Sequence, residues 1–297
     1  MTQFSALFKR NTKLFFKDKG LFFTSLITPL ILLVLYSVFL GKVYKDSFLM
    51  AVPEGITIED SLMNGLVGGQ LLSSLLAVCC VTVAFCSNLL MVQDKSSGAY
   101  KDLTVSPVKS GTLSLAYYLS CAFSTFVVCF VALVAGLFYL YVTGWYMTLS
   151  HILVLVGDVI IMVLFGTSLS SVVICRLTTQ GQASAVGSVV SSVYGFICGA
   201  YMPISSFPEG LQKVLGFLPG TYGTSLLRNH CLDGVFEEMQ RQSLPGELIT
   251  GFKDVVDCNL YVFDTRVEVS AMYAVLVGVT ALLVLGYILL CRFQKKK

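Results

Sequence analysis

Long apolar runs alternate with short polar segments along the whole chain. A helix needs about 20 mostly apolar residues to cross the hydrocarbon core of a bilayer, and six runs meet this length. The pattern therefore predicts an all-α integral membrane protein with six transmembrane helices, forming a single domain over residues 1–297. The predicted spans are 21–40, 66–92, 113–142, 152–175, 183–201 and 269–291.

The N-terminal segment 1–19 is amphipathic rather than uniformly apolar. At about 100° per residue, one helical face collects Phe4, Leu7, Phe8, Leu14 and Phe15. The opposite face collects Lys9, Arg10, Lys13 and Lys17. Such a helix lies in the membrane interface, with its basic face toward the lipid headgroups. It serves either as a topology anchor or as a lever that contacts a cytoplasmic partner.

Three prolines interrupt the segment that follows the fifth span. Because proline ends helices, the pieces that Pro203, Pro208 and Pro219 define are too short to cross a bilayer. We therefore expect a re-entrant outer helical hairpin over 203–230, followed by an outer loop over 231–268. The residues expected to shape the hairpin are Pro203, Pro208, Leu211, Pro219 and Tyr222, and those expected to face lipid or cargo are Leu211, Val214, Leu215 and Phe217.

Composition agrees with this membrane assignment. The 297 residues are 56% hydrophobic and 12% charged, with a mean hydropathy of +0.81, whereas soluble domains carry about 25% charged residues. No segment is polar enough and long enough to form a separate soluble domain. We expect membrane lipids as partners and no nucleic acid.

Charge is distributed unequally between the two sets of loops. One set, with both termini, holds 13 basic residues against three acids, and the opposite loops hold seven basic residues and 13 acids. Cytoplasmic loops carry the excess of Lys and Arg. The pattern predicts a multi-pass protein of the cell membrane with both termini in the cytoplasm, and with the hairpin and the loop after it outside. The N-terminus lacks the features of a cleavable signal peptide.

Span five carries small residues at every fourth position: Ala183, Gly187, Ser191, Gly195 and Gly199. Small residues at this spacing let another helix approach closely in lipid. This face packs either on a neighbouring span of the same chain, or on a second copy or the transport pathway.

Asp158 is the only acidic residue inside a predicted span. Because a charge there costs several kcal/mol, Asp158 is a possible pathway acid, unless it is a hydrogen-bonded structural residue. The only two histidines, His151 and His230, lie at or beyond the outer membrane edge without a nearby cluster of ligands. We expect them to be interfacial residues and expect no metal site.

Most of the ten cysteines lie in or at the ends of spans, where Cys acts as a small apolar residue. Only Cys231 and Cys258 fall in the outer loop. They form either a disulfide or two free thiols.

The longest inner loop, 94–110, contains Ala99–Val105, a stretch that Gly98 and Pro107 bracket and that is long enough for two helical turns. This extra length suggests a contact surface. The sequence contains no phosphate-binding loop, no H-E-x-x-H and no G-x-S-x-G motif. We therefore expect no enzyme activity and no cofactor in this chain by itself.

Three features together resemble the permease subunit of type-2 ABC transporters, in the drug-exporter branch that includes daunorubicin-type permeases. The first is the amphipathic N-terminal helix. The second is 98–108, which looks like the family's G-T-x-x-x-L-x-x-[ST]-P-V segment, with Ala99 where Thr is common. The third is 203–212, which follows the pattern P-x-x-x-x-P-x-x-L-x, with Pro219, Tyr222 and Arg228 after it.

The resemblance implies an ATP-driven exporter of a hydrophobic or amphiphilic compound such as a drug, a peptide or a lipid. Two permease copies, expected to be a homodimer, would bind two copies of a separate ATPase that holds ATP and Mg²⁺. The residues implied to couple to the ATPase are Ala99, Tyr100, Lys101, Asp102, Leu103 and Thr104. The implied dimer or pathway face is Gly187, Ser191, Gly195 and Gly199.

Two other functions stay open on the sequence. One is a permease that exports a polysaccharide or teichoic acid, although apolar spans suit an amphiphilic cargo better than a polar polymer. The other is a non-transporting membrane scaffold or sensor with the outer loop as its binding module. A neighbouring ATPase gene, or ATPase stimulation on co-purification, separates the second from a transporter.

Overall fold

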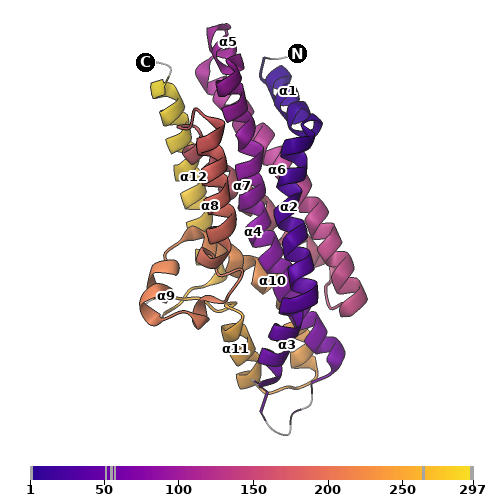
Figure 1. The fold of residues 1–297 in the computed structure, drawn as a ribbon. Coiled ribbons are helices and arrows are strands. Elements are labelled where there is room, and N and C mark those ends of the chain that lie inside the picture. The colour runs from indigo at the N-terminus through magenta and orange to yellow at the C-terminus, as the bar shows by residue number, and fades with distance from the viewer. Residues whose placement is uncertain (1–2, 51, 54–55, 57, 263–264, 295–297) are drawn as a thin grey trace.

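A computed structural model describes residues 3–50, 52–53, 56, 58–262 and 265–294 as a bundle of helices (Figure 1). The long helices are α1 (Gln3–Lys17), α2 (Lys19–Leu35), α4 (Asp60–Ser97), α6 (Ser110–Thr143), α7 (Leu149–Ile174), α8 (Gln180–Ile197), α10 (Pro219–Arg241) and α12 (Val269–Gln294). The shorter ones are α3 (Gly41–Met50), α5 (Ala99–Val105), α9 (Glu209–Leu215) and α11 (Gly246–Val255). Strands β1 (Tyr261–Val262) and β2 (Thr265–Arg266) pair in an antiparallel hairpin.

Five helical segments in the described part of the chain are long and apolar enough to cross a membrane: Lys19–Met50, Asp60–Ser97, Ser110–Thr143, Leu149–Ile174 and Val269–Arg292. They coincide with five of the six predicted spans. The predicted span 183–201 falls on α8, which has only 18 residues and begins with the polar Gln180-Gly181-Gln182. The six-span topology therefore stays a prediction.

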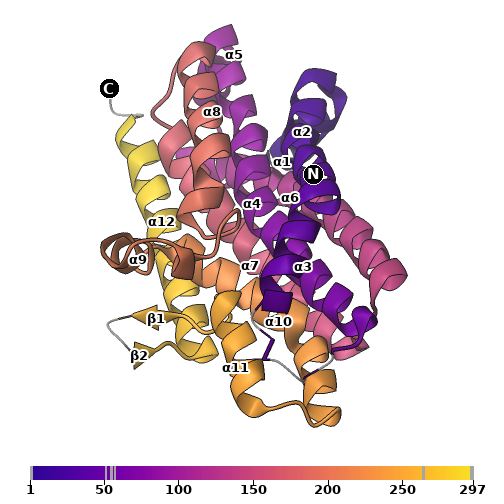
Figure 2. The ribbon, with the colours of Figure 1, turned by 60° about the horizontal axis from the view of Figure 1, so that its bottom comes forward.

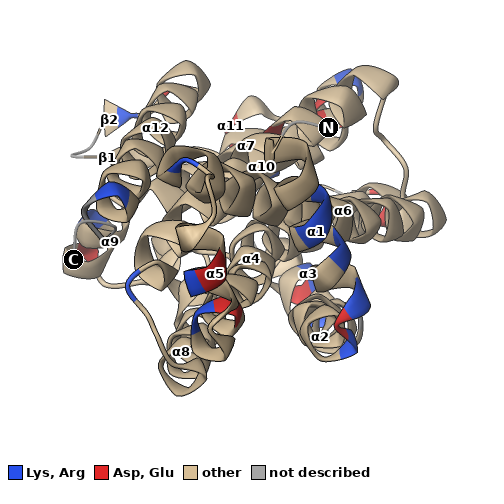
Figure 3. Cartoon of the chain, turned by 90° about the horizontal axis from the view of Figure 1, so that it is seen from above, with Lys and Arg blue, Asp and Glu red and all other residues tan. Residues whose placement is uncertain are grey.

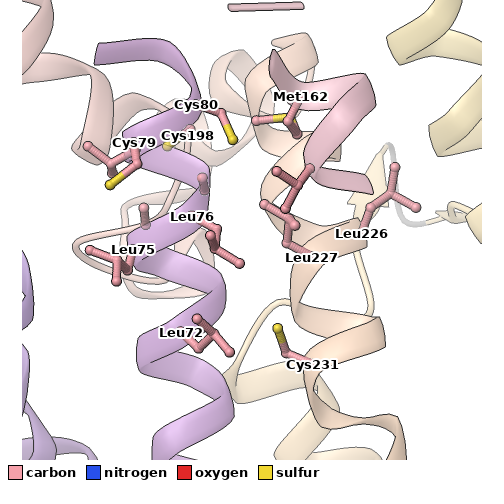
Figure 4. Close-up of a cluster of buried hydrophobic side chains, with 14 of the residues drawn as sticks. Leu72, Leu75, Leu76, Cys79, Cys80, Met162, Cys198, Leu226, Leu227 and Cys231 are labelled. Atoms are coloured by element: carbon pink, nitrogen blue, oxygen red, sulfur yellow. The ribbon is translucent and has the colours of Figure 1, made fainter. Parts of the chain in front are cut away.

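Helix α4 forms the centre of the bundle. It is apolar around almost its whole circumference, as expected of a helix buried on all sides, and α2, α6, α7, α8 and α10 pack around it. Figure 4 shows Leu76 of α4 and Leu227 and Cys231 of α10 directed into the layer between these two helices. All three side chains are buried.

The bundle has two different ends. Both chain termini lie near α5 at one end, which we call the α5 end, and α9, α11 and the β-hairpin lie toward the other, which we call the α11 end (Figure 1). Figure 2 brings the α11 end forward and shows α9, α10, α11 and the strands gathered there. The inner loop and both ends of the chain thus lie at the same end of the bundle, and the side of the membrane that they face stays a prediction.

The expected hairpin differs from the structure in its second arm. The first arm, α9, is short as predicted, but α10 begins at Pro219 and continues for 23 residues to Arg241. The chain offers no further proline before Pro245, and Leu226, Leu232 and Phe236 bury α10 in the core. Residues 231–268 are accordingly not a simple loop, because they hold the end of α10, α11 and the β-hairpin. Membrane re-entry of the segment stays a prediction.

Candidate functional site

The predicted short helix of the inner loop is confirmed as α5. Gly98 has a φ of 86°, a left-handed conformation that glycine adopts without steric cost. The chain therefore turns sharply at the end of α4 and starts a new helix. No residue of α5 is buried, so the helix projects beyond the bundle at the α5 end (Figure 1).

Two sides of α5 have different surroundings. Tyr100 and Leu103 are half-buried and pack against the apolar side chains where α4, α6 and α12 meet. The Tyr100 ring lies 6.2 Å from that of Tyr117, with Lys95 Nζ 5.6 Å above its centroid. The side away from the bundle exposes Lys101, Asp102 and Val105, and the last is 86% exposed.

The remaining predicted coupling residues, Ala99 and Thr104, are half-buried. The Thr104 hydroxyl donates to the Lys101 carbonyl at 2.7 Å. Burial raises the pKa of Tyr100 to about 12, so its phenol stays neutral at physiological pH. Only part of the predicted set is therefore free to meet a partner, and the rest fixes α5 to the bundle.

Asp94 joins three helices just before α5. Arg10 of α1 donates to both of its oxygens, at 2.8 and 2.9 Å, and the Tyr117 hydroxyl of α6 donates to Oδ2 at 2.5 Å. The hydrogen bond to Asp94 raises the pKa of Arg10, although burial opposes it. Bidentate Arg–carboxylate pairs fix geometry as well as charge, so this joint ties α1 to the base of α5.

Arg10 was expected on the basic, headgroup-facing side of α1, and that placement was wrong. The buried edge of α1 is Leu7, Asn11 and Phe15, at intervals of four residues, and Arg10 flanks it. No local pattern points to its partner Asp94, which lies 84 residues away. Helix α1 packs on α6, α2 and α4, and Figure 3 shows its Lys and Arg positions on the rim of the α5 end.

Lys95 fastens the same region to the turn after α7. Its Nζ donates to the carbonyls of Cys175 and Leu177, at 2.5 and 3.2 Å. One turn of α4 therefore holds α1, α6 and the α7–α8 connection together.

Arg228 forms the corresponding joint at the α11 end. Arg228 is 1% exposed. Its guanidinium donates to Asp257 Oδ2 at 3.1 Å and to the Gly199 carbonyl at 2.5 Å. Asp257 also accepts from the backbone amides of Ile204 and Ser205, at 2.5 and 3.2 Å. A single ion pair thus connects the end of α8, the turn before α9, α10 and the segment after α11. Arg228 belongs to the sequence pattern of the predicted hairpin, whereas no sequence pattern marks its partner Asp257.

Asp158 is buried at the α11 end in contact with two other helices. Its Oδ2 lies 2.5 Å from His230 Nδ1 of α10, and its Oδ1 accepts from the hydroxyl of Tyr273 on α12. The His230 and Tyr273 rings stack with centroids 6.2 Å apart. The sequence identified the acid but not its partners, because they are 72 and 115 residues away.

The other outer residues have ordinary roles. His151 and Thr148 cap the start of α7, and His151 Nε2 lies 3.6 Å from Glu237. Among the described residues, no group of His, Cys, Asp and Glu could hold a metal ion. Cys231 and Cys258 are both buried free thiols, which agrees with the second of the two expectations for them, and burial raises the pKa of Cys258 to about 12.

The small-residue positions of span five do not form one surface. A side chain added at Gly187 would meet nothing within 4 Å, whereas a Cβ at Gly195 would lie 2.3 Å from the Tyr201 ring. Gly199 lies beyond the end of α8 with a φ of 74° and contacts Ile204. Gly195 and Gly199 thus pack within the chain, and only Gly187 and half-buried Ser191 face outward.

The hairpin prolines lie where the sequence placed them, since Pro203 and Pro208 precede short helices and Pro219 starts α10. Leu211, Val214 and Phe217 are exposed by 42%, 60% and 57%. Leu215 is buried, so its expected exposure was wrong; it is the last residue of α9, and its carbonyl accepts from the Thr221 hydroxyl of α10 at 2.8 Å. Tyr222 is buried as well.

Comparison with known families adds the decisive finding. The family model of the ABC-2 type transporter matches residues 2–231, which include α5, the Arg10–Asp94 pair, Asp158 and Arg228. No curated protein matched the chain in a sequence comparison. Because the family match covers well over half of the 297 residues, the chain belongs to the ABC-2 type transporter family and is a multi-pass membrane permease subunit of an ABC transporter.

Proposed function

We propose that this chain is the permease of an exporter that moves a hydrophobic or amphiphilic compound outward across the cell membrane. In this proposal two copies of the chain associate with two copies of a separate ATPase, which supplies ATP and Mg²⁺. The α5 end faces the cytoplasm with both termini. The family places the chain in an ABC transporter, and the apolar spans favour an amphiphilic cargo over a polar polymer.

The observation that carries the proposal is the position of α5. It is a projecting helix with an outward side of Lys101, Asp102 and Val105, and the Asp94 joint lies directly behind it. A partner that grips α5 therefore acts on the end of α4, to which α1 and α6 are hydrogen-bonded. Movement of the ATPase would pass to the bundle by this route.

The test is co-purification with a tagged candidate ATPase, followed by ATPase assays with a panel of amphiphiles. A variant with Lys101→Glu and Val105→Ser changes only exposed positions of α5. We expect it to fold normally and to lose most ATPase binding and stimulation. Leu103 is unsuitable for this test, because Leu103→Ala would loosen the attachment of α5 to the bundle.

The matched control is Lys213→Glu on α9, an equivalent charge reversal in a helix of the same length at the α11 end. We expect it to bind the ATPase normally. Equal loss in both variants, or normal ATPase coupling in the α5 variant, would show that α5 is not the coupling helix. Stimulation by an undecaprenyl-linked polysaccharide alone would favour the polymer exporter instead.

A further inference from the structure

The contacts of Asp158 define more than a structural pair. His230 Nδ1 lies 2.5 Å from Asp158 Oδ2, and the Tyr273 hydroxyl donates to Oδ1. An ionised carboxylate only accepts hydrogen bonds, so in the pair of ionised Asp158 and His230 the tautomer with the proton on Nδ1 makes this contact. The Asp158 side chain is 1% exposed and that of His230 is 15% exposed. The carboxylate is thus enclosed by protein, while part of the imidazole lies at the protein surface.

This geometry leaves His230 Nε2 as the nitrogen that gains or loses the titrating proton. When Nε2 is unprotonated, the contact to Asp158 is a hydrogen bond from a neutral ring. When Nε2 is protonated, the same contact becomes an ion pair, and charge-assisted hydrogen bonds are roughly twice as strong as neutral ones. The strength of the contact between α7 and α10 therefore depends on one exchangeable proton.

We propose that Asp158, His230 and Tyr273 form a proton-binding site, in which uptake of a proton on His230 tightens the hold of α10 on α7 and α12. The site lies at the α11 end. His230 is two residues after Arg228 in α10. The inference relies on the proposed function only for placing this end outside the cell. Proton uptake would then make the outer part of the permease more rigid.

The charged groups around His230 favour its protonated form. Asp158 of α7 and Asp233 of α10 contribute negative charge, and Tyr273 of α12 is a neutral donor. Burial lowers the pKa of His230, but the hydrogen bond and charge of Asp158, with the charge of Asp233, outweigh it, and the net pKa lies above 6.5.

Three further charged groups lie near Asp233 and change the pKa of Asp233 rather than that of His230. Lys253 of α11 and His151 of α7 lower the pKa of Asp233, whereas Glu237 of α10 raises it. Burial is nevertheless the largest influence and leaves the pKa of Asp233 raised above its usual value. His151 and Glu237 also contact each other, and their effects on the pKa of Asp233 are opposite in direction.

The sign of the pH effect follows from the raised pKa. A histidine whose pKa is higher in the folded state contributes stability that is fully present below the unfolded pKa of about 6.5. This contribution is lost as the pH rises through the higher pKa of the folded state. The cluster is therefore tightest below about pH 6.5 and loosens as the pH rises above the pKa of the folded state.

The test compares wild type with His230→Asn in the purified full-length protein. Asn places an N–H donor where Nδ1 lies, but it cannot take up a proton. We expect the thermal unfolding midpoint of wild type to exceed that of the variant by roughly 2–4 °C at pH 6, with the difference falling toward zero by pH 9. A difference that is absent, or that does not change with pH, overturns the proposal.

The matched control is His151→Asn, which alters the only other histidine of the chain. Its partner Glu237 is 54% exposed, and exposed pairs contribute little. We expect its unfolding midpoint to follow wild type within about 1 °C at every pH. A pH-dependent difference as large as that of His230→Asn would assign the proton site to His151 and contradict the proposal.

A second measurement does not depend on whether His230→Asn folds. With two histidines in the chain, histidine-labelled protein gives two imidazole NMR signals, and the His151→Asn variant identifies that of His230. We expect this signal to titrate with a midpoint above 6.5, and to move toward 6.5 in Asp158→Asn. A midpoint at or below 6.5 in wild type overturns the proposal. Neither measurement needs ATPase or cargo, so failure here is separable from failure of the proposed function.

Discussion

The two ends of the bundle are held by ion pairs that differ in their exposure. At the α5 end, the Asp94–Arg10 pair is partly exposed, with 32% of the Arg10 side chain accessible, and α5 itself has no buried residue. At the α11 end, the Arg228–Asp257 pair is almost fully enclosed, at 1% and 7%, and backbone groups of Gly199, Ile204 and Ser205 complete its hydrogen bonds. The α5 end leaves surface for a partner, and the α11 end is closed by the chain's own contacts.

This difference indicates where stability and where coupling reside. Buried charge pairs are costly to break, because a remaining partner stays in the interior without compensation. Partly exposed pairs are weaker and can rearrange. We therefore expect changes at the α11 end to affect folding first, and changes at the α5 end to affect partner binding first.

Arg228→Met should cause the largest loss of stability and so test the role of the α11 end most directly. It leaves Asp257 buried without its cation, and removal of one partner of a buried pair costs about 3–5 kcal/mol. The free energy of unfolding, measured by denaturation in mild detergent, should fall by this amount. The control is Arg241→Met, since Arg241 is 75% exposed and reaches only Glu238 at 3.6 Å. A loss below about 1 kcal/mol at Arg228 would mean that the α11 end is not held by this pair.

Gly195→Leu and Gly187→Leu should separate internal from external packing on α8. At Gly195 the new side chain would collide with Tyr201, and overpacking typically costs about 1–3 kcal/mol. At Gly187 it meets open space, so monomer stability should be unchanged. If α8 also contacts a second copy, Gly187→Leu should reduce the dimer fraction in native mass spectrometry. Normal assembly of Gly187→Leu would remove Gly187 from any dimer face.

Arg10→Gln should have an intermediate effect at the α5 end. It removes the charged bidentate contact to Asp94 while Tyr117 still donates to that carboxylate. Because the pair is partly exposed, the expected loss is only about 1–2 kcal/mol. Protease cleavage between α1 and α2 should accelerate, and ATPase stimulation should fall more than stability does. Lys9→Gln, at an exposed neighbouring position, should change neither; an equal effect there would argue against the Asp94 joint.

Val105→Ser should have the smallest effect on folding. Val105 is 86% exposed, and surface substitutions away from special features usually change stability by less than about 0.5 kcal/mol. Urea denaturation should give an unchanged midpoint, while affinity for the ATPase, measured by titration, should decrease. A clear loss of stability would mean that α5 packs on this chain more tightly than its exposure indicates.

Sequence reasoning was most successful where local rules decide the structure. The apolar runs predicted the five long membrane helices, Gly98 and Pro107 set the limits of α5, and the prolines marked the starts of α9 and α10. It failed where distant segments compete for one surface. The second arm of the hairpin is longer than expected because α10 buries Leu226 and Phe236, and the small residues of α8 divide between internal and external contacts.

The sequence by itself therefore determined the class of protein, the position of α5 and the identity of single unusual residues such as Asp158 and Arg228. These follow from hydropathy, helix-ending residues and the cost of charge in a membrane, all of which are properties of short segments. Only the tertiary structure decided the partners: Asp94 for Arg10, Asp257 for Arg228, and His230 with Tyr273 for Asp158. Each pair joins residues far apart along the chain, and no local pattern records which buried charge will meet which.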